Sequence, residues 1–286
     1  MATRFDTPTE LEEREQTALE QLIKRLADDE FVLAERYTEW QVRAPTLESD
    51  LALANNAQDE LGHARLWYDV LEELGYEEQD LVYERDPTDF RHSTLVELPF
   101  EEGNWADPIL RSYLYDAAEK LRLEALESST HPKIADRVGK IQNEEGYHLE
   151  HARSWLKRLA DDDKGQGKLQ ETLDRLFPHA LTIFEPVDRD VESAIVDFGL
   201  RDATVEELGE DWLAAVVPEL ESFGLAPPLK DQGDAAGFVA SQECLPEKRG
   251  RDGNHTDAWF DLYDEFTHTY NELDRSTATT IMSKPE

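Results

Sequence analysis

The chain has 286 residues, and 29 Lys and Arg stand against 65 Asp and Glu, which gives a formal net charge of −36 and a pI near 4.4. So acidic a chain repels nucleic acid and anionic lipid, because attraction to either depends on Lys and Arg neutralising phosphates. Its longest apolar run, residues 212–217, is far shorter than the ~20 residues of a membrane helix. The single cysteine, Cys244, excludes an internal disulfide and a multi-cysteine metal site. We therefore expect a cytoplasmic protein with no nucleic-acid partner, no membrane association and no secretory signal.

The acidity does not indicate disorder. The chain contains 6 Trp, 9 Tyr and 11 Phe and is 39% hydrophobic, which is enough for a core. Its acidic residues are spread along the whole length with few Lys, a pattern that suits concentrated salt, where charge repulsion is screened. We therefore expect a halophilic protein that unfolds at low ionic strength.

The first half of the chain predicts two helical hairpins. Helix formers with apolar residues at helical spacing run over about 8–43, Ala44-Pro45 breaks the pattern, and a second helix follows from Thr46 to about Gly75. Residues 76–107 contain the turn signals Asp86-Pro87, Pro99 and Gly103-Asn104, which predict a long irregular connection with at most a short helix. Helices over 108–128 and 133–161 come next, separated by a break at 128–132. Four long helices joined by a short, a long and a short connection are typical of a four-helix bundle.

The second half predicts additional C-terminal helices over about 168–184, 205–222 and 256–275, with a loop-like stretch over 223–254. Strand signals are nearly absent, so the predicted class is all-α. We expect a four-helix core over residues 1–165 and a helical extension over residues 166–286 that packs on the same domain.

Two segments carry the pattern Glu-x-x-His, namely Glu60 with His63 and Glu145 with His148. A Glu and a His three residues apart lie on one helix face about 5–6 Å apart, so both can reach one metal ion. One match means little in a chain so rich in Glu, where a lone carboxylate is usually a solvated surface charge and a lone His a hydrogen-bonded structural residue. Two matches, each on the second helix of a predicted hairpin, indicate a shared site.

The hairpin geometry adds a carboxylate from each first helix. Residues equally far before and after a turn lie at the same height, because both helices rise 1.5 Å per residue. Glu30 pairs with Glu60 about Pro45, and Asp116 pairs with Glu145 about the break at 128–132. Glu119 is a rival to Asp116, since its midpoint with Glu145 also falls in that break.

Ferritin-like di-iron bundles use one carboxylate from each of two helices and a Glu-x-x-His from each of the other two. In that arrangement Glu60 and Glu145 would bridge two metal ions, each histidine would bind one ion, and the remaining carboxylates would be terminal ligands. Oxygen and imidazole ligands without thiolate suit iron or manganese. The predicted ligand set is Glu30, Glu60, His63, Asp116, Glu145 and His148.

The sequence supports a role in this site, or in binding phosphate, less strongly for several other residues. Glu35 is a rival ligand, and His151 is a candidate for contact with the ligands rather than with metal. Asp59 and Glu144 precede the two ligand Glu residues and could anchor the histidines, although a solvated face explains them equally well. The basic segment Lys248–Arg251 stands out in an acidic chain and could meet phosphate.

Several segments resemble the ferritin-like subunits of phenylacetyl-CoA epoxidase (ring 1,2-epoxidase), and most closely its C subunit. They are Arg-Ala-Pro-Thr-Leu-Glu-Ser-Asp-Leu-Ala-Leu-Ala-Asn at 43–55, the 61–65 region, Leu-Val-Glu-Leu-Pro at 95–99, Gly-Asn-Trp-Ala-Asp at 103–107, Tyr-His-Leu at 147–149 and His-Thr at 255–256. The resemblance covers nearly the whole chain.

The resemblance implies a subunit of a multicomponent di-iron monooxygenase that uses O2 to epoxidise the aromatic ring of phenylacetyl-CoA in phenylacetate catabolism. It implies a hetero-oligomer with a related A-type subunit, together with other epoxidase subunits, and electrons from a separate flavin and iron–sulfur reductase. In bacterial relatives the C subunit is a scaffold that has lost several ligands, whereas this chain keeps all six. Its Gln58–His63 segment matches the A-type ligand segment, and the A-type pattern also favours Asp116 over Glu119.

The expected catalytic residues are therefore the bridging Glu60 and Glu145. One alternative is a scaffold subunit that binds the catalytic A-type subunit while it carries a vestigial metal site. A further alternative is a ferritin-like iron-binding protein, which fits the bundle but not the resemblance beyond residue 170.

Overall fold

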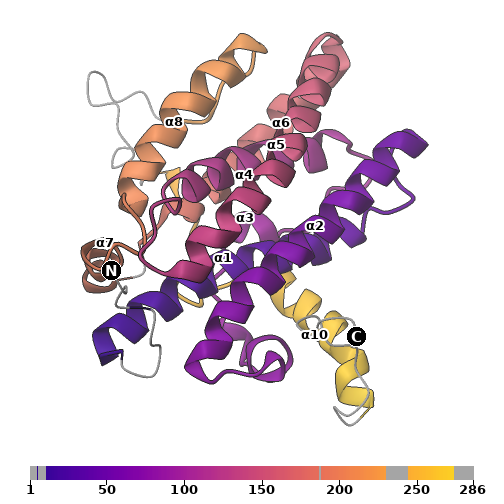
Figure 1. Cartoon of the computed structure of the whole chain (residues 1–286). Helices are drawn as coiled ribbons and strands as arrows, with labels where there is room; N and C mark the ends of the chain where they lie inside the picture. The colour runs from indigo at the N-terminus through magenta and orange to yellow at the C-terminus, as the bar shows by residue number, and fades with distance from the viewer. Residues whose placement is uncertain (1–4, 6–10, 187, 230–243, 274–286) are drawn as a thin grey trace.

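The structure is a computed structural model that describes residues 5, 11–186, 188–229 and 244–273, and no strand occurs among them. Two helical hairpins form its centre (Figure 1): one packs α1 along α2, the other packs α4 along α5, and α2 contacts α5 between them. The helices are α1 (Glu13–Thr38), α2 (Leu47–Leu71), α4 (Ala106–Glu124) and α5 (Pro132–Ala160). The predicted all-α, ferritin-like four-helix bundle is confirmed.

The connections within the bundle are short, long and short, as the sequence predicts. The long crossover between α2 and α4 contains η3 (Glu72–Leu74), a single π-helical turn η4 (Gln79–Tyr83), η5 (Pro87–Asp89) and the four-residue helix α3 (Thr94–Glu97). With this crossover, α1 and α4 are the first helices of the two hairpins. Their carboxylates Glu30 and Asp116 face the same interior as the ligand residues of α2 and α5.

The first helix ends earlier than predicted, at Thr38 rather than near residue 43, and residues 8–10 of the predicted helix lie outside the described part. Val42 takes a left-handed backbone with φ of 64°, which is sparsely populated for a β-branched residue and cannot continue a helix. The Asp50 carboxylate accepts hydrogen bonds from the backbone N–H of Val42 at 2.8 Å and of Ala44 at 3.3 Å. A side chain from the next helix therefore shapes this turn, together with the predicted break at Pro45.

The remaining helices pack around the bundle. α6 contacts α4 and α5, α7 contacts α1, and α8 contacts α4. In Figure 1, α8 and α10 lie on opposite sides of the bundle. Their bounds are α6 (Asp163–Ala180), η6 (Leu181–Phe184), α7 (Arg189–Asp197), α8 (Val205–Ser222) and α10 (Asp257–Glu272). The division of the chain at residue 165 stays a prediction.

Two of these elements differ from the sequence prediction. α6 begins at Asp163, five residues before the predicted start at 168. The Asp162 carboxylate caps this end by accepting the backbone N–H of Gly165, so Gly165 and Gly167 lie within the helix. α7 was not predicted, and its start is capped by Asp188, which accepts from the backbone N–H groups of Asp190 and Val191. Part of the predicted loop, residues 230–243, and the predicted helix end beyond residue 273 lie outside the described residues.

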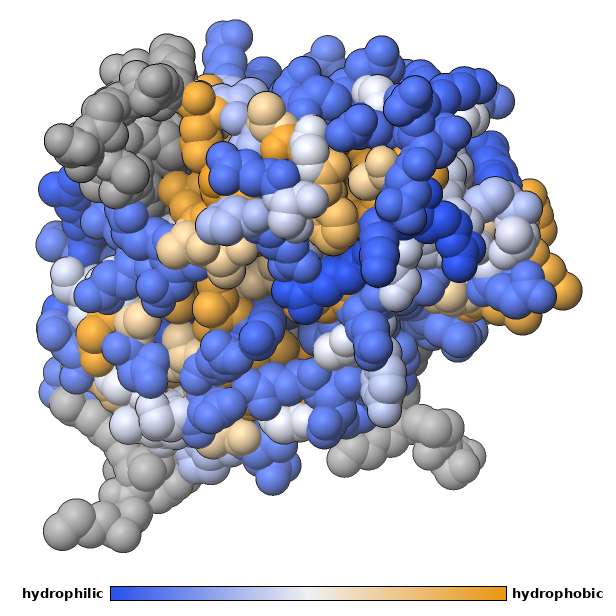
Figure 2. Space-filling model, turned by 90° about the horizontal axis from the view of Figure 1, so that it is seen from above, coloured by the Kyte–Doolittle hydropathy of each residue, from blue (hydrophilic) through white to orange (hydrophobic). Residues whose placement is uncertain are grey.

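One continuous apolar core runs through the described part of the molecule, and Trp67, Trp212 and Trp259 are completely buried within it. The face in Figure 2 is mainly hydrophilic, with apolar residues exposed between charged ones. Within the described ranges, no helix combines the length and apolarity needed to cross a membrane. The bundle therefore has an apolar interior, in which a cluster of charged side chains is costly unless the charges are paired.

Candidate metal centre

All six predicted ligands are buried in the middle of the bundle, each at most 4% exposed. α1 contributes Glu30 and α4 contributes Asp116, while α2 and α5 each contribute a Glu and a His from one face. Residues from positions 30 to 148 thus meet at one depth, as the hairpin geometry requires.

The six residues form two overlapping groups whose ligand atoms lie within 4.8 Å of one another. One group contains Glu30 and His63, the other contains Asp116 and His148, and both contain Glu60 and Glu145. The shared pair is the pair assigned as bridging ligands from the sequence. This arrangement provides two adjacent positions for metal ions.

The ligand atoms have no other partner. Both carboxylate oxygens of Glu30, Glu60 and Glu145, one oxygen of Asp116, and Nδ1 of both histidines are buried without a hydrogen bond. The closest approaches between histidine and carboxylate in the interior are 3.3 Å from His63 Nδ1 and 3.5 Å from His148 Nδ1, both to Glu145 Oε1. Leaving so many buried polar atoms unsatisfied is costly in any folded protein. Metal ions would satisfy all of them, so the residues fit a dinuclear site.

The metal-free cluster retains protons. Burial, together with the negative charges of Glu145 and Glu30, raises the pKa of Glu60 well above its usual range, and burial and Glu145 do the same for Asp116. Burial disfavours a charged His148, but the nearby carboxylates of Asp59 and Glu145 outweigh it and raise the His148 pKa to about 10. Metal ions must displace these protons, because they bind carboxylate and neutral imidazole.

Each histidine is held from the opposite hairpin. His63 on α2 donates from Nε2 to Glu144 Oε2 on α5 at 2.9 Å, and His148 on α5 donates from Nε2 to Asp59 Oδ2 on α2 at 3.3 Å. These bonds leave Nδ1 of both rings facing the interior of the cluster. A carboxylate on the outer nitrogen of a ligand histidine is a usual feature of metal sites, because it sets the tautomer and the ring orientation.

The rival residues lie outside both groups. Glu119 is buried beside the cluster, but its Oε2 pairs with Nε of Arg122 at 3.2 Å. Glu35 is half-buried, and burial with the nearby charges of Glu265 and Glu39 raises its pKa to about 7. His151 is half-exposed and belongs to neither group. By position, Asp116 is the α4 residue that completes the cluster.

Three neighbours of the cluster were not anticipated from the sequence. Ser112 donates to the Asp116 carboxylate at 2.7 Å, a contact that its position four residues earlier on the same helix could have indicated. The buried hydroxyls of Tyr37 and Tyr115 have no hydrogen-bond partner, and both pKa values are raised by burial and by nearby cluster carboxylates. The tyrosines come from α1 and α4, and nothing in their local sequence distinguishes them from core residues.

The fold and this cluster define the class of protein: a ferritin-like helical bundle with a candidate dinuclear metal centre. The chain belongs to the family described as phenylacetic acid catabolic protein, whose family model matches residues 1–276. It is 39% identical over 171 residues to the C subunit of 1,2-phenylacetyl-CoA epoxidase from Escherichia coli (strain K12), covering 58% of this chain and 68% of that relative.

A second relative is the A subunit of the same epoxidase from the same organism. The identity is 27% over 195 residues, which covers 67% of this chain and 62% of the relative. The match therefore spans less than two thirds of the length of this second relative.

Proposed function

We propose that this chain is a subunit of a multicomponent monooxygenase that epoxidises the aromatic ring of phenylacetyl-CoA, and that its own cluster holds two iron ions. The observation that carries the proposal is the complete set of six buried ligand residues whose inward atoms lack other partners. The similarity to the C and A subunits of the epoxidase supports the choice of reaction.

When bound, the two irons supply the activation of O2 that the protein side chains cannot provide. Glu60 and Glu145 would be shared by the two positions, and each of the other four residues would contribute to one position or the other. Glu144 and Asp59 keep the histidine rings oriented through their outer nitrogens. Burial of the whole set keeps bulk water away from the metal positions. Electrons come from a separate flavin and iron–sulfur reductase, since a single cysteine cannot hold an iron–sulfur cluster.

Substitution of Glu60 tests this role. In the assembled complex, Glu60→Ala is expected to lower phenylacetyl-CoA-dependent oxygen consumption by orders of magnitude, because it removes a ligand shared by both positions. Glu35→Ala, on the same bundle but outside the cluster, is the matched control and should retain activity. Assembly is measured by size-exclusion chromatography of the same samples, since removing one buried carboxylate can also destabilise the bundle.

The second candidate function is a scaffold within the same complex, favoured because the identity to the C subunit is higher than that to the A subunit. Wild-type turnover by a complex that contains metal-free Glu60→Ala would establish the scaffold and reject the catalytic role. Iron storage is a weaker candidate, because it would need a cage-forming homo-oligomer, which a size measurement detects.

We also propose a hetero-oligomer with a related A-type subunit. Three apolar side chains in the turn after α1 and at the start of α2 are exposed, with Val42 at 89%, Leu47 at 71% and Leu51 at 57%. Exposed apolar groups gathered at one place on a highly charged protein favour a protein contact there. Co-expression with the A-type subunit should give a joint peak in high salt, and Leu47→Asp with Leu51→Asp should weaken it. A chain that elutes alone under these conditions would count against the assembly.

A further inference from the structure

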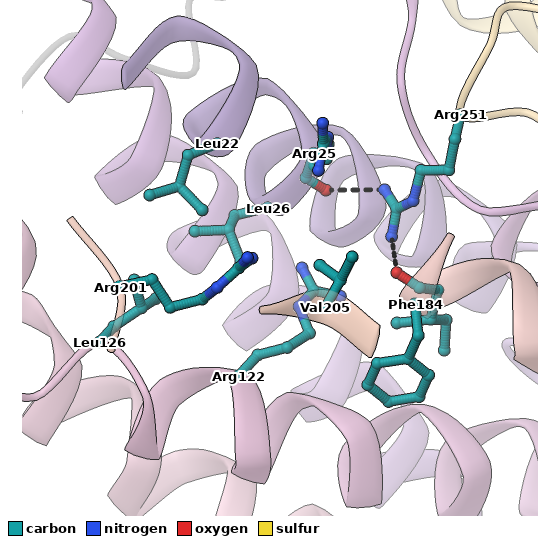
Figure 3. A pocket seen from close by; sticks show the side chains of 10 residues that line it. Leu22, Arg25, Leu26, Arg122, Leu126, Phe184, Arg201, Val205 and Arg251 are labelled. Carbon is teal, nitrogen blue, oxygen red and sulfur yellow. Dashed lines mark hydrogen bonds between the residues drawn. The ribbon is translucent and has the colours of Figure 1, made fainter. Parts of the chain in front are cut away.

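Four arginines line a small, partly open cavity of about 20 Å³ between α1, α4, η6, the start of α8 and the loop before α10 (Figure 3). They are Arg25, Arg122, Arg201 and Arg251, each at most 6% exposed. The rest of the lining consists of Leu, Ile, Val and Phe side chains. A cavity of this size holds about one particle as large as water, which needs ~10–15 Å³.

Arg251 belongs to the basic segment considered for phosphate from the sequence, but its side chain is directed into the molecule. It pairs with both carboxylate oxygens of Asp29 and donates to the backbone carbonyls of Arg25, Arg91 and Ile183. Its neighbour Arg249 pairs with Glu185. Exposed phosphate binding by this segment is therefore not supported.

Direct ion pairs do not neutralise the cavity. Arg122 shares Asp29 with Arg251 and also pairs with Glu119, while Arg25 and Arg201 both pair with Glu192. Each guanidinium group therefore has a carboxylate partner, but four guanidinium groups share three carboxylates, which leaves a net excess of one positive charge. In a chain of net charge −36, this buried positive excess is unusual.

The cavity also has unused hydrogen-bond donors. Nε and Nη2 of Arg25 and Nη2 of Arg122 are buried without a partner among the described residues. In Figure 3 the guanidinium groups of Arg122 and Arg201 point toward the centre of the view from different sides. Burial and the positive charges of Arg251 and Arg201 lower the pKa of Arg25 to about 10, although Glu192 opposes this shift. Unused donors and an excess of positive charge therefore occur together in the lining of this cavity.

We propose that this cavity binds a single halide ion, which in the cell is chloride. A halide is only slightly larger than water, accepts several hydrogen bonds, and carries the one negative charge that the ion pairs leave unmatched. Water suits the site less well, because its own protons would find few acceptors among the arginines and apolar side chains. An oxyanion such as phosphate is too large for the cavity.

The direct test uses bromide as the probe. Crystals of the full chain grown or soaked in sodium bromide should show an anomalous peak in the cavity, within hydrogen-bonding distance of Arg25 and Arg122. Bromide peaks elsewhere on the protein with none in the cavity would overturn the proposal. This measurement needs no variant, so it stands even if an arginine substitution prevents folding.

A thermal test separates the halide from general salt effects. At one high ionic strength, replacing sodium gluconate by sodium chloride should raise the melting temperature by about 3–6 °C when chloride is about ten times its dissociation constant. Arg25→Gln should abolish this chloride-specific shift, whereas Arg153→Gln, which removes an arginine from an exposed ion pair with Glu219, should keep it. An unchanged shift in Arg25→Gln, or a larger shift with phosphate than with chloride, would contradict the halide site.

Discussion

The six-residue candidate metal centre (the metal cluster) and a second histidine cluster differ in how their polar atoms are satisfied. His92, Glu97 and His255 are completely buried or nearly so, and their potential ligand atoms also lie within 4.8 Å of one another. Here, however, Glu97 Oε2 accepts from His92 Nε2 and His255 Nδ1, both at 2.7 Å. Its other oxygen accepts from the backbone N–H of Thr256 at 2.7 Å, and His255 Nε2 donates to the carbonyl of Phe90 at 3.1 Å.

Residue type and distance therefore do not distinguish the two clusters, but the hydrogen-bond inventory does. In the second cluster only one ring nitrogen, Nδ1 of His92, lacks a hydrogen-bond partner. In the metal cluster nearly all of the inward-facing oxygen and nitrogen atoms lack one. A cluster whose lone pairs are already used by N–H donors serves to join chain segments, in this case the crossover and the start of α10. A cluster whose lone pairs are unused can offer them to metal cations.

Metal analysis should separate the clusters most strongly. After anaerobic reconstitution in high salt we expect about two irons per chain, as in other ferritin-like di-iron bundles. Glu60→Ala and Glu145→Ala should each abolish binding, while the matched variant Glu97→Gln should leave the iron content unchanged. Fewer than half an iron per folded wild-type chain, or a fully loaded double variant, would reject the site.

The same Glu97→Gln variant should lose stability instead. Removing the charge from a buried carboxylate between two imidazoles is expected to lower the free energy of unfolding by about 3 kcal/mol. Urea unfolding in high salt, followed by circular dichroism, measures this change. Loss of a bound metal from Glu97→Gln without a change in stability would show that the second cluster is also a metal site.

The second cluster should also make stability depend on pH. Burial and the nearby His255 lower the pKa of His92 to about 4, although Glu97 acts in the opposite direction. An unfolded His has a pKa of about 6.5, so between those values the unfolded chain binds a proton that the folded one does not. His92 thus reduces stability as pH falls from about 6.5 to 4, by up to about 3 kcal/mol. Metal-free His92→Gln should show a flatter profile over this range, and an unchanged profile would refute the assignment.

The outer carboxylates of the metal cluster should have the smallest effect. Asp59→Ala and Glu144→Ala are each expected to weaken metal affinity by about 10–100-fold, because each removes the contact that orients a ligand histidine. Glu150→Ala on the exposed side of α5 is the control. Competition with a chelator measures the affinities, and equal values for all three variants would show that the outer contacts do not support the ligands.

Much of the fold and of the candidate site followed from local geometry. Helical periodicity and the break at Pro45 place the long helices, and a rise of 1.5 Å per residue brings Glu30 level with Glu60. The spacing of three puts each Glu-x-x-His pair on one face. These features depend on residues near one another in the chain, so the amino-acid sequence by itself determined the all-α class and which six residues meet.

Only the tertiary structure decided which neighbours those residues have. Asp116 and Glu119 have nearly equal heights from the sequence, but in the structure only Asp116 lies in one of the two groups, while Glu119 lies beside Arg122. The pairing of His63 with Glu144 depends on how α2 contacts α5, a relation between residues 81 positions apart. The arginine cavity likewise assembles residues from positions 25 to 251. Such contacts arise where segments distant in the sequence pack together. The direction in which each side chain points and the extent of its burial then depend on the whole fold rather than on local spacing.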